Sequence, residues 1–541
     1  MKKVSADIAI IGSGLAGLSA AINAKESAPE LEVVVCSKSK PGLANCTAVS
    51  QGFFRNSNPS YPPERHEKET IKSGYGLNNR VLVKVLAQNA AAGIAALEKY
   101  GVDFKERARG SQTFGEKNGQ EGMRLIRPLL AYARSIGVKF IYPFFSWEII
   151  KEGCRVCGIW GFAGKEQEPV IVEAPAVVLA SGGAGSLYSR SDNPPGITGD
   201  GYAMAYRAGL LLVDMEFVQF YPLVAAIPGR GAKFLPALLA DAGRFLNNLG
   251  EDLVEKYKID KLPLAVASRD TLSRAIALEV FGNRGIEGAI KLEFPYGAEG
   301  WERAGRLRGV DNLEKFKTYV DKFAVEEGYL LVMPAAHFFI GGIIIDERCR
   351  TALEGLFAAG EVCGGLHGAN RLGGNALAEA VVFGRIAGEE AKEHARREKL
   401  RGPAVSSALE KQVEAAFKQL LQHCEEHGKI DAEEQSCRAL KKRIGELMWN
   451  KAGLIRSAES LQEAKAVLKE YQDSWSFKLG RNDIRTVLEL KNMLLVAQVI
   501  VEAALVREES RGAHYRLDYP HLRKAWQQNI IVSSKGLQVR E

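Results

Sequence analysis

Short apolar runs and glycines at the start of the chain predict a strand, a helix and a second strand. Ile8 to Ile11 is apolar, too short for a helix, and ends at a glycine. Leu15 to Lys25 is alanine-rich and favours a helix, and Leu31 to Cys36 is a second apolar run. The unit has the length of a βαβ crossover, which predicts an α/β fold with a Rossmann-like nucleotide-binding domain.

Hydrophobic periodicity predicts further elements of this domain. Residues 146–174 alternate between apolar and polar positions and contain glycine turns, which is typical of an antiparallel ribbon. Residues 53–80 are rich in Asn, Ser and Pro, and we expect them to be irregular. Helices are expected at Arg80 to Tyr100 and Met123 to Ile136, and strands at Lys139 to Tyr142, Ala176 to Ala180, Gly341 to Asp346 and Gly355 to Glu361.

Changes in composition divide the chain into three predicted domains. A chain of 541 residues is too long for one hydrophobic core. The composition shifts near Pro222, so we expect residues 223–340 to form an inserted α+β capping domain between two segments of the first domain, 1–222 and 341–390. Residues 391–541 are charged and helix-forming, without predicted strands, and Met493 to Val506 is expected to be a buried helix.

Charge and cysteine content narrow the function classes. The net charge is +7, but Lys and Arg are interleaved with Asp and Glu, so nothing favours nucleic acid. Met1 to Asp7 leaves no room for a signal peptide and no apolar run reaches about 18 residues. We therefore expect a cytoplasmic protein with no transmembrane segment. Cys154 and Cys157 have CxxC spacing, but with no second pair nearby we expect incidental thiols and no metal site.

Glycines at the first strand–helix junction point to a dinucleotide. In the sequence Gly12-Ser13-Gly14-Leu15-Ala16-Gly17, the first glycine allows a tight turn and the second lets a pyrophosphate approach the backbone. The third lets the helix pack closely on the strand, and the pyrophosphate would lie at the helix N-terminus. The alternative is a glycine-rich turn that only packs.

A second small-residue turn follows a second buried strand. Ala180 is followed by Ser181-Gly182-Gly183-Ala184-Gly185, where the other half of a dinucleotide passes the backbone in larger folds of this type. Asp200, in Thr198-Gly199-Asp200-Gly201, could accept a hydrogen bond from a ribityl hydroxyl. The alternative for Asp200 is capping of the helix predicted at Tyr202 to Ala208.

These motifs occur together with others in an order that resembles the flavoproteins of fumarate reductase, succinate dehydrogenase and L-aspartate oxidase. The resemblance covers nearly the whole chain and implies an FAD domain in two pieces, a capping domain and a C-terminal helical domain. Its further motifs are Ala267 to Ile276, Pro334 to Gly342, Gly360 to Leu377, Leu490 to Leu494 and Glu509 to Arg516.

The resemblance implies FAD as the cofactor, which we expect to be bound non-covalently. Cys46 aligns with the residue that carries covalent flavin in respiratory members, so a thioether at Cys46 is the alternative. Glu361 is expected to bind ribityl hydroxyls, its alternative being an ordinary acid at a strand end. The expected cofactor-binding residues are Gly12, Ser13, Gly14, Leu15, Ala16, Gly17, Lys38, Asn45, Cys46, Thr47, Ser50, Gln51, Gly52, Ala180, Gly182, Gly183, Asp200, Glu361, Asn375, Ala376 and Leu377.

Three side chains carry the chemistry that the resemblance implies. Arg269 matches the arginine that delivers a proton to the substrate, and His337 and Arg371 match the pair that holds one substrate carboxylate beside the flavin. The guanidinium fork suits a carboxylate, and histidine can donate to its second oxygen. Asp270 is a candidate proton relay to Arg269. The alternatives are a structural ion pair between Arg269 and Asp270 and a core role for His337.

The chain departs from the family pattern at residues that bind the second carboxylate of the substrate in relatives. Relatives have Gln-Phe-His-Pro-Thr where this chain has Gln-Phe-Tyr221-Pro-Leu223, and the Thr-Glu and Arg-Gly-Glu elements that follow are absent from 234–244. Residues 110–124 also lack the histidines of relatives. A second carboxylate would be buried without compensation. We therefore expect a small carboxylate with an apolar or aryl arm, packed against Tyr221 and Leu223, and not a standard C4 dicarboxylate.

The expected function is an FAD-dependent oxidoreductase that transfers a hydride between flavin N5 and a C–C bond next to a carboxylate. One alternative is an amino-acid oxidase of the aspartate oxidase kind. Another is a flavin subunit that passes electrons to an iron–sulphur partner, which would also place the protein at the periphery of a membrane through that partner. The sequence leaves these alternatives open.

Overall fold

A five-stranded parallel sheet forms the centre of the molecule. The computed structural model describes residues 1–104, 106–108, 111–113, 121–165, 167–226, 233–308, 313–325, 328–399, 405–425, 437–474 and 484–540. The strand order is β19-β11-β2-β3-β7, and every neighbouring pair is parallel. The strands are β2 (Ile8–Ile11), β3 (Val33–Cys36), β7 (Lys139–Ile141), β11 (Ala176–Leu179) and β19 (Leu356–Ala358). The predicted βαβ unit is therefore confirmed.

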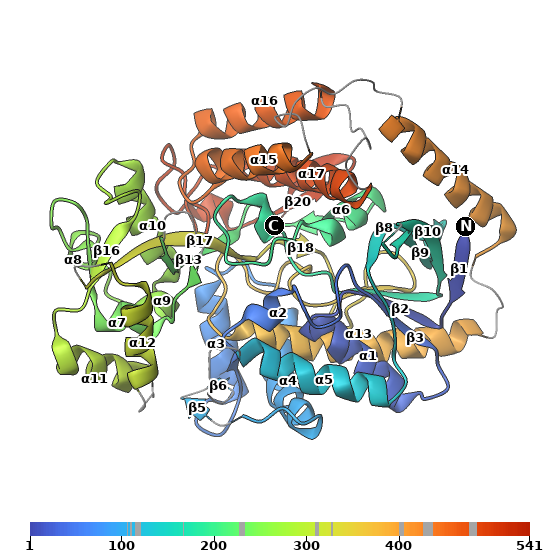
Figure 1. Ribbon diagram of the computed structural model, residues 1–541, viewed down its shortest axis with the longest axis horizontal. Helices are drawn as coiled ribbons and strands as arrows, with labels where there is room; N and C mark the ends of the chain where they lie inside the picture. The colour runs from blue at the N-terminus through green and yellow to red at the C-terminus, as the bar shows by residue number, and fades with distance from the viewer. Residues whose placement is uncertain are drawn as a thin grey trace.

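Helices pack closely beneath this sheet (Figure 1). The first helix, α1 (Leu15–Ser27), lies against α13 (Asn375–Glu398), the helix that returns from the far end of the domain. A Cβ on Gly388 of α13 would lie 2.3 Å from the carbonyl oxygen of Ala20, so glycine allows this approach. The other helices of this domain are α2 (Cys46–Val49), α3 (Pro63–Ser73), α4 (Arg80–Lys99), α5 (Glu121–Ser135) and α6 (Asp200–Arg207).

The helix α3 corrects one expectation, because residues 53–80 are not irregular throughout. They contain a short strand, β4 (Phe53–Arg55), as well as α3. The segment of α3 is strongly polar, and apart from Pro63 its only apolar residue is Ile71, so apolar residues at helical spacing do not mark it. Its signals are a proline at the first helical position and an acidic residue in the first turn. It is held to the body by buried His66, whose Nε2 lies 2.9 Å from Asn375 Oδ1.

The ribbon predicted for residues 146–174 is confirmed. Strands β8 (Phe144–Glu152), β9 (Arg155–Ala163) and β10 (Glu168–Glu173) are antiparallel, and β1 (Lys2–Ser5) pairs with β10 in parallel. Cys154 is exposed at the turn between β8 and β9, whereas Cys157 is buried in β9. A further small sheet joins β4 to β5 (Glu106–Ala108) and β6 (Ser111–Thr113).

Residues 218–339 form a second sheet with its own hydrophobic cluster, at the left of Figure 1. Two long strands, β13 (Val218–Ala225) and β17 (Leu330–Phe339), pair with each other and connect this region to the body. The other elements are β14 (Lys233–Phe234), β15 (Arg244–Leu246), β16 (Ile290–Glu293), α7 (Leu238–Ala242), α8 (Leu253–Lys256), α9 (Leu264–Ala267), α10 (Arg269–Phe281), α11 (Gly297–Arg308) and α12 (Glu314–Phe323).

The C-terminal part combines helices with two strands, so the expectation of no strands after residue 390 is wrong. The helices are α14 (Ser407–Glu425), α15 (Cys437–Ala452), α16 (Ala458–Ser474) and α17 (Ile484–Val506), and the last is buried as predicted. Strand β20 (Asn529–Ser533) pairs with β21 (Gly536–Arg540) and with β12 (Leu212–Val213), which also pairs with β18 (Gly342–Ile343). The end of the chain is thereby tied back to the first domain. The predicted boundary at residue 390 falls inside α13.

One described helix, α4, is long and apolar enough to cross a membrane by length and composition. It is nevertheless part of the folded body. A Cβ added to Gly93 of α4 would lie 2.7 Å from Val381 of α13, and Leu82, Val83 and Leu86 are buried in the main hydrophobic cluster. A helix that packs in this way is typical of a protein core.

Candidate active site

One large cavity lies along the carboxyl ends of the parallel strands, and the N-terminus of α1 faces it. Gly12 ends β2 with φ +110°, and a Cβ there would lie 2.2 Å from the carbonyl oxygen of Ala180. The N-cap residue of α1, Gly14, provides no side-chain cap, so the amides and the positive dipole of this helix face the cavity. This arrangement suits a pyrophosphate.

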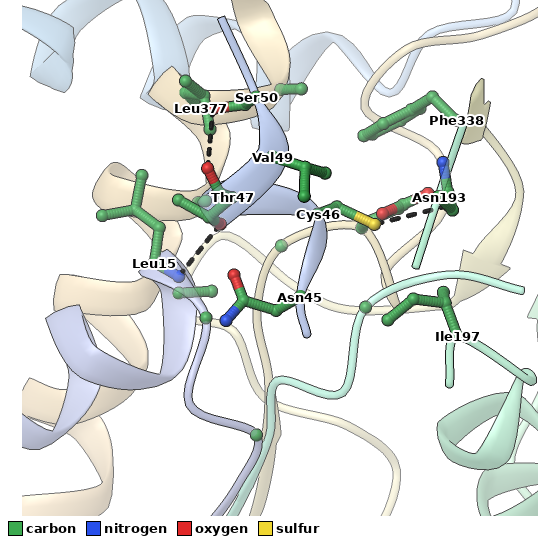
Figure 2. Close-up of a pocket in the computed structure, with 18 of the residues that line it drawn as sticks. Leu15, Asn45, Cys46, Thr47, Val49, Ser50, Asn193, Ile197, Phe338 and Leu377 are labelled. Atoms are coloured by element: carbon green, nitrogen blue, oxygen red, sulfur yellow. Dashed lines mark hydrogen bonds between the residues drawn. The ribbon is translucent and has the colours of Figure 1, made fainter. Parts of the chain in front are cut away.

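Three more segments line the same cavity, part of which is drawn in Figure 2. Helix α13 begins after Gly374, which has φ +88° and no side-chain cap, and its first turn lines the cavity at Ala376 and Leu377. On α2, Thr47 Oγ1 accepts a hydrogen bond from the amide of Leu15 at 3.2 Å. Gly182 has φ +77° and nothing within 4 Å of an added Cβ, so its backbone is open to a ligand.

Most of the predicted cofactor residues line this cavity. They are Gly12, Ser13, Gly14, Leu15, Ala16, Lys38, Asn45, Cys46, Thr47, Ser50, Gln51, Gly52, Ala180, Gly182, Asp200, Glu361, Ala376 and Leu377.

Three predicted cofactor residues do not line the cavity, and each has a packing role. A Cβ on Gly17 would lie 2.0 Å from the carbonyl oxygen of Gly12, and one on Gly183 would lie 2.3 Å from Glu361 Oε1. Asn375 is fully buried and hydrogen-bonds His66 and Thr70. These residues shape the site without facing it.

Lys38 and Asp200 form an ion pair at the edge of the cavity, with 2.6 Å between Nζ and Oδ2. Burial alone would lower the pKa of Lys38, but Asp200 and Glu489 together raise it. Asp200 also accepts hydrogen bonds from Thr198 and Asn492. It is the first residue of α6, whose N-cap is Gly199, so the capping alternative is wrong.

Glu361 is a partly buried carboxyl group in the cavity wall. Its Oε1 accepts a hydrogen bond from the amide of Phe339 at 3.0 Å. Burial raises the pKa of Glu361 to about 7. At neutral pH the group is therefore able to donate to or accept from hydroxyl groups, as the sugar alcohol of a flavin nucleotide requires.

Arg269, His337 and Arg371 come from distant parts of the chain and line one end of the same cavity. Arg269 is the first residue of α10, His337 lies on β17, and Arg371 precedes α13. Buried Gln219 links two of these segments. Its Oε1 accepts from Arg269 Nη1 at 2.9 Å, and its Nε2 donates to Asn370 Oδ1 and to the carbonyl oxygen of Arg371.

Arg371 is a buried guanidinium with unused hydrogen-bonding capacity. Its Nε has no hydrogen-bond partner in the part of the chain that the structure describes. Burial, followed by the nearby charge of Arg269, lowers the pKa of Arg371 to about 9. Its guanidinium also stacks on Phe338, 4.5 Å from the ring centroid. Two neighbouring cations and an unsatisfied donor favour an anionic ligand.

His337 is paired with Asp192, a residue that the sequence interpretation missed. The distance between His337 Nδ1 and Asp192 Oδ2 is 2.7 Å. Burial is the largest cause that lowers the pKa of His337, and Arg371 and Arg269 lower it further, against the opposing effect of Asp192. Asp192 lies between two glycine-containing motifs, and no local pattern distinguishes it from a loop residue.

Aromatic side chains form the wall beside His337. Tyr221 stacks on Phe234 with 4.2 Å between the ring centroids, and the Tyr221 hydroxyl donates to the carbonyl oxygen of Leu235. The sequence interpretation missed Phe234, which lies in the adjacent strand β14. Leu223 is buried in the hydrophobic cluster of residues 221–335 and does not line the cavity, so the expectation that it contacts the substrate is wrong.

Asp270 does not form the expected link to Arg269. Its Oδ2 accepts a hydrogen bond from the Tyr75 hydroxyl at 2.8 Å, and the guanidinium of Arg269 donates instead to Gln219 and to the carbonyl oxygen of Ala265. Successive side chains of a helix point in different directions, so neighbours in sequence are separated. Much of the 110–124 segment, at residues 110 and 114–120, lies outside the described residues.

Comparisons with known proteins agree with this geometry. The FAD binding domain model matches residues 7–377, and the fumarate reductase flavoprotein C-terminal model matches residues 441–539. The chain is 34% identical to one of the subunits of fumarate reductase (CoM/CoB) from Methanothermobacter marburgensis, over 98% of this chain and 97% of that protein. The chain belongs to the fumarate reductase/succinate dehydrogenase flavoprotein family.

Other relatives of this flavoprotein give the same result. An uncharacterized FAD-dependent oxidoreductase of Methanocaldococcus jannaschii is 32% identical over 98% of this chain and 97% of its own. The FrdA chain of Escherichia coli quinol fumarate reductase superposes with a TM-score of 0.86 at 27% identity, covering 100% of this chain and 97% of that chain. Sdh1 of Mycobacterium smegmatis gives a TM-score of 0.81 at 28% identity, covering 100% and 95%.

The flavoprotein is thus an FAD-dependent oxidoreductase of a family that acts on CH–CH groups. Its cavity fits FAD, because two helix N-termini, the open backbone at Gly182 and the carboxyl group of Glu361 line one space. Cys46 lies in this wall, and its thiol donates to Asn193 Oδ1 at 3.3 Å (Figure 2).

Proposed function

We propose that this flavoprotein reduces, or in reverse forms, a carbon–carbon double bond next to the carboxylate of a monocarboxylic acid with an apolar or aryl arm. The observation that carries the proposal is the convergence of Arg269, His337 and Arg371 beside an aromatic wall in the FAD cavity. Bound FAD would supply or accept the hydride. The remaining steps fall to side chains of this chain.

Arg371 and His337 are proposed to hold the substrate carboxylate. An anion here would satisfy the unpaired Nε of Arg371 and offset the repulsion between Arg371 and Arg269. Holding the carboxylate between two cations also stabilises negative charge that develops next to it during the reaction. Arg269 is the proposed proton donor to the α-carbon, since its guanidinium lies in the same wall and neighbours Arg371.

The proposed preference for an apolar arm follows from the residues beside Arg269 and His337. The stacked rings of Tyr221 and Phe234, together with Ala237 and Val266, line this part of the cavity. An aryl or alkyl group can pack on the rings. A second carboxylate against this wall would lose its hydration without matching hydrogen bonds, which costs several kcal/mol.

Reoxidation of the reduced flavoprotein by different acids tests the proposal. Cinnamate- and acrylate-type acids are expected to reoxidise the bound flavin at least about tenfold faster than fumarate, the discrimination that a hydrophobic contact provides. Flavin absorbance under anaerobic conditions is the measurement. Efficient turnover of fumarate would contradict the preference. Hydrogen peroxide formed with amino acids and oxygen would instead indicate an oxidase of the aspartate oxidase kind.

We also propose that the flavoprotein exchanges electrons with an iron–sulphur partner protein. The support is that relatives are named as subunits of fumarate reductases, a term that describes components of larger enzymes. Purification from the native source without disrupting complexes is expected to recover a second chain that contains iron and acid-labile sulphide. Full activity of the isolated chain with a physiological electron donor would contradict this proposal.

A further inference from the structure

The pairing of His337 with Asp192 determines which ring nitrogen is available to a ligand. Asp192 Oδ2 lies 2.7 Å from Nδ1, and a carboxylate accepts hydrogen bonds but does not donate them. The hydrogen in this bond therefore belongs to Nδ1. The other nitrogen, Nε2, makes no hydrogen bond with any residue that the structure describes, and His337 lines the cavity.

Asp192 is held firmly in this position. Its amide donates to the carbonyl oxygen of Ala336, and Oδ1 accepts from Asn193 Nδ2 at 2.9 Å. The same Nδ2 donates to the carbonyl oxygen of His337 at 3.1 Å. The segment thus runs alongside β17 at the residue that carries the imidazole, and the orientation of the ring is set by the fold.

This tautomer has a consequence for carboxylate binding. A neutral imidazole that carries its hydrogen on Nδ1 presents a lone pair at Nε2. A lone pair repels a carboxylate oxygen. To donate to the carboxylate, as the proposed function requires, Nε2 must first acquire a proton.

We propose that binding of the substrate carboxylate is coupled to the uptake of one proton from solvent by Nε2 of His337, and that Asp192 is the positioning residue that fixes this coupling. The inference rests on the proposed function, because it takes a carboxylate as the ligand of His337 and Arg371. The proton forms an Nε2–H bond in the complex and is released again when the carboxylate leaves.

The charges around His337 support this coupling. Arg371 and Arg269 act on it from the loop before α13 and from α10, Asp192 hydrogen-bonds its Nδ1, and the ring of Tyr221 lies 5.4 Å away. Burial and the two guanidiniums lower the pKa of free His337, so the ring is neutral at neutral pH. A bound carboxylate offsets the guanidiniums and, with Asp192, favours the imidazolium form.

Cys46 and Glu361 also lie in the cavity, and Glu361 is a rival site for the proton. Its pKa is raised to about 7 by burial, and the charge of Arg371 acts on it. An anion bound at Arg371 would raise this pKa further, which would also take up a proton. The experiment must therefore distinguish proton uptake by His337 from proton uptake by Glu361.

Calorimetric titration of the oxidised, flavin-loaded protein with benzoate tests the coupling. Benzoate carries an aryl group and a carboxylate but no reducible double bond next to the carboxylate. Titrations at pH 7.5 in two buffers with different ionisation enthalpies give the number of protons exchanged. We expect close to one proton taken up, and an affinity that falls about tenfold per pH unit as pH rises between the pKa values of free and bound His337.

Three variants assign the proton. In Asp192→Asn the uptake is expected to fall towards zero and the affinity to become nearly independent of pH. In Asp270→Asn, a matched change of a nearby acid that hydrogen-bonds Tyr75, the uptake is expected to remain. In Glu361→Gln, studied after flavin content is measured, it is also expected to remain. Loss of uptake in Glu361→Gln with retention in Asp192→Asn would overturn the proposal.

Failure of this inference and failure of the proposed function have different signatures. If the wild-type protein binds benzoate without taking up a proton, the coupling is wrong and the carboxylate site stands. This result needs no variant, so the proposal can be contradicted even if Asp192→Asn does not fold. If benzoate and related acids do not bind at all, the proposed carboxylate site itself is wrong.

Discussion

The two ends of the cavity are built from different parts of the polypeptide. At the cofactor end, much of the contact surface is backbone, at the N-termini of α1 and α13 and the open turn at Gly182, and the side chains of Lys38, Asp200 and Glu361 add to it. At the substrate end, the contacts are offered by side chains, chiefly Arg269 and Arg371. The cofactor end depends mainly on backbone dihedral angles and free space, and the substrate end depends mainly on functional groups.

This difference predicts two kinds of damage. A change at Gly12 of the cofactor end should release the flavin, because a Cβ there meets the backbone of Ala180, which has no room to move. Changes at the cationic side chains should leave the flavin bound and slow the reaction. The distinction would be wrong if the Gly12 variant kept its flavin, or if a variant at a cationic side chain lost its flavin as well as its activity.

The largest effect is expected for Arg269→Gln. The change removes the proposed proton donor and one of two neighbouring cations, while the glutamine can still hydrogen-bond Gln219. Turnover is expected to fall by about 10³-fold, within the range for removal of a general acid. Stopped-flow reoxidation of the reduced protein by the best acid found above measures it, and flavin content should be unchanged.

Arg274→Gln is the matched control for this change. Arg274 lies on the same helix, α10, and its guanidinium stacks on Tyr515, 4.8 Å from the ring centroid. Its removal should change turnover by less than about twofold, since it does not line the cavity. Equal losses in both variants would show that α10 had been disturbed and would remove Arg269 from the proposed mechanism.

A smaller but distinct effect is expected at the cofactor end for Gly12→Ala. Its φ is +110° and the new Cβ would lie 2.2 Å from the carbonyl oxygen of Ala180. FAD binding should weaken by about 100-fold or more, corresponding to about 3 kcal/mol, because strand β11 must shift. Fluorescence titration of the flavin-free protein measures it.

Gly153→Ala is the control for Gly12→Ala, because it introduces backbone strain away from the cofactor. Gly153 has φ +60° at the exposed turn between β8 and β9, with nothing within 4 Å of an added Cβ. The substitution should cost about 1 kcal/mol of unfolding free energy, the usual penalty for this conformation. FAD affinity should stay as in the wild type. Weakened FAD binding in this control would mean that the Gly12→Ala result reports general instability.

The same contrast explains what could be predicted from the sequence. The cofactor end uses contiguous segments whose glycines and apolar runs are local signals, so Gly12 to Ala16 and the parallel strands around them could be located by pattern alone. Arg269, His337 and Arg371 are more than 30 residues apart in sequence, and no spacing links them. They could be grouped only through the family resemblance.

The residues that were missed act through tertiary contacts. The role of Asp192 can be recognised only in the folded protein, where its segment pairs with β17 and its carboxylate contacts His337. Asp270, although adjacent to Arg269, faces Tyr75 because of the helix geometry. The strands β20 and β21 follow a long helical region, and they are stabilised by pairing with β12 from the first domain. A local sequence pattern does not reveal these contact partners, because they lie far away in the chain.

A moderate effect is expected at the aromatic wall for Tyr221→His. The imidazole would replace the ring that stacks on Phe234 and provide a polar partner for a second carboxylate. The ratio of kcat/KM for fumarate to that for a cinnamate-type acid is expected to rise about tenfold, a typical gain for one contact. Tyr221→Phe, which keeps the ring and removes the hydroxyl that hydrogen-bonds Leu235, should leave the ratio unchanged. A fall in the ratio for Tyr221→His would contradict the proposed substrate arm.

The smallest effect is expected for Cys46→Ala, in the lining of the cavity. Burial, followed by the charges of Glu361 and Asp192, raises the pKa of the Cys46 thiol well above its usual range, so the reactive thiolate is disfavoured. Flavin is therefore expected in the supernatant after acid precipitation of both the wild-type protein and the variant, and turnover should change by less than about twofold. A yellow pellet from the wild type that turns colourless in Cys46→Ala would instead reveal a thioether. In that case one contact at the cofactor end would be a covalent bond to a side chain.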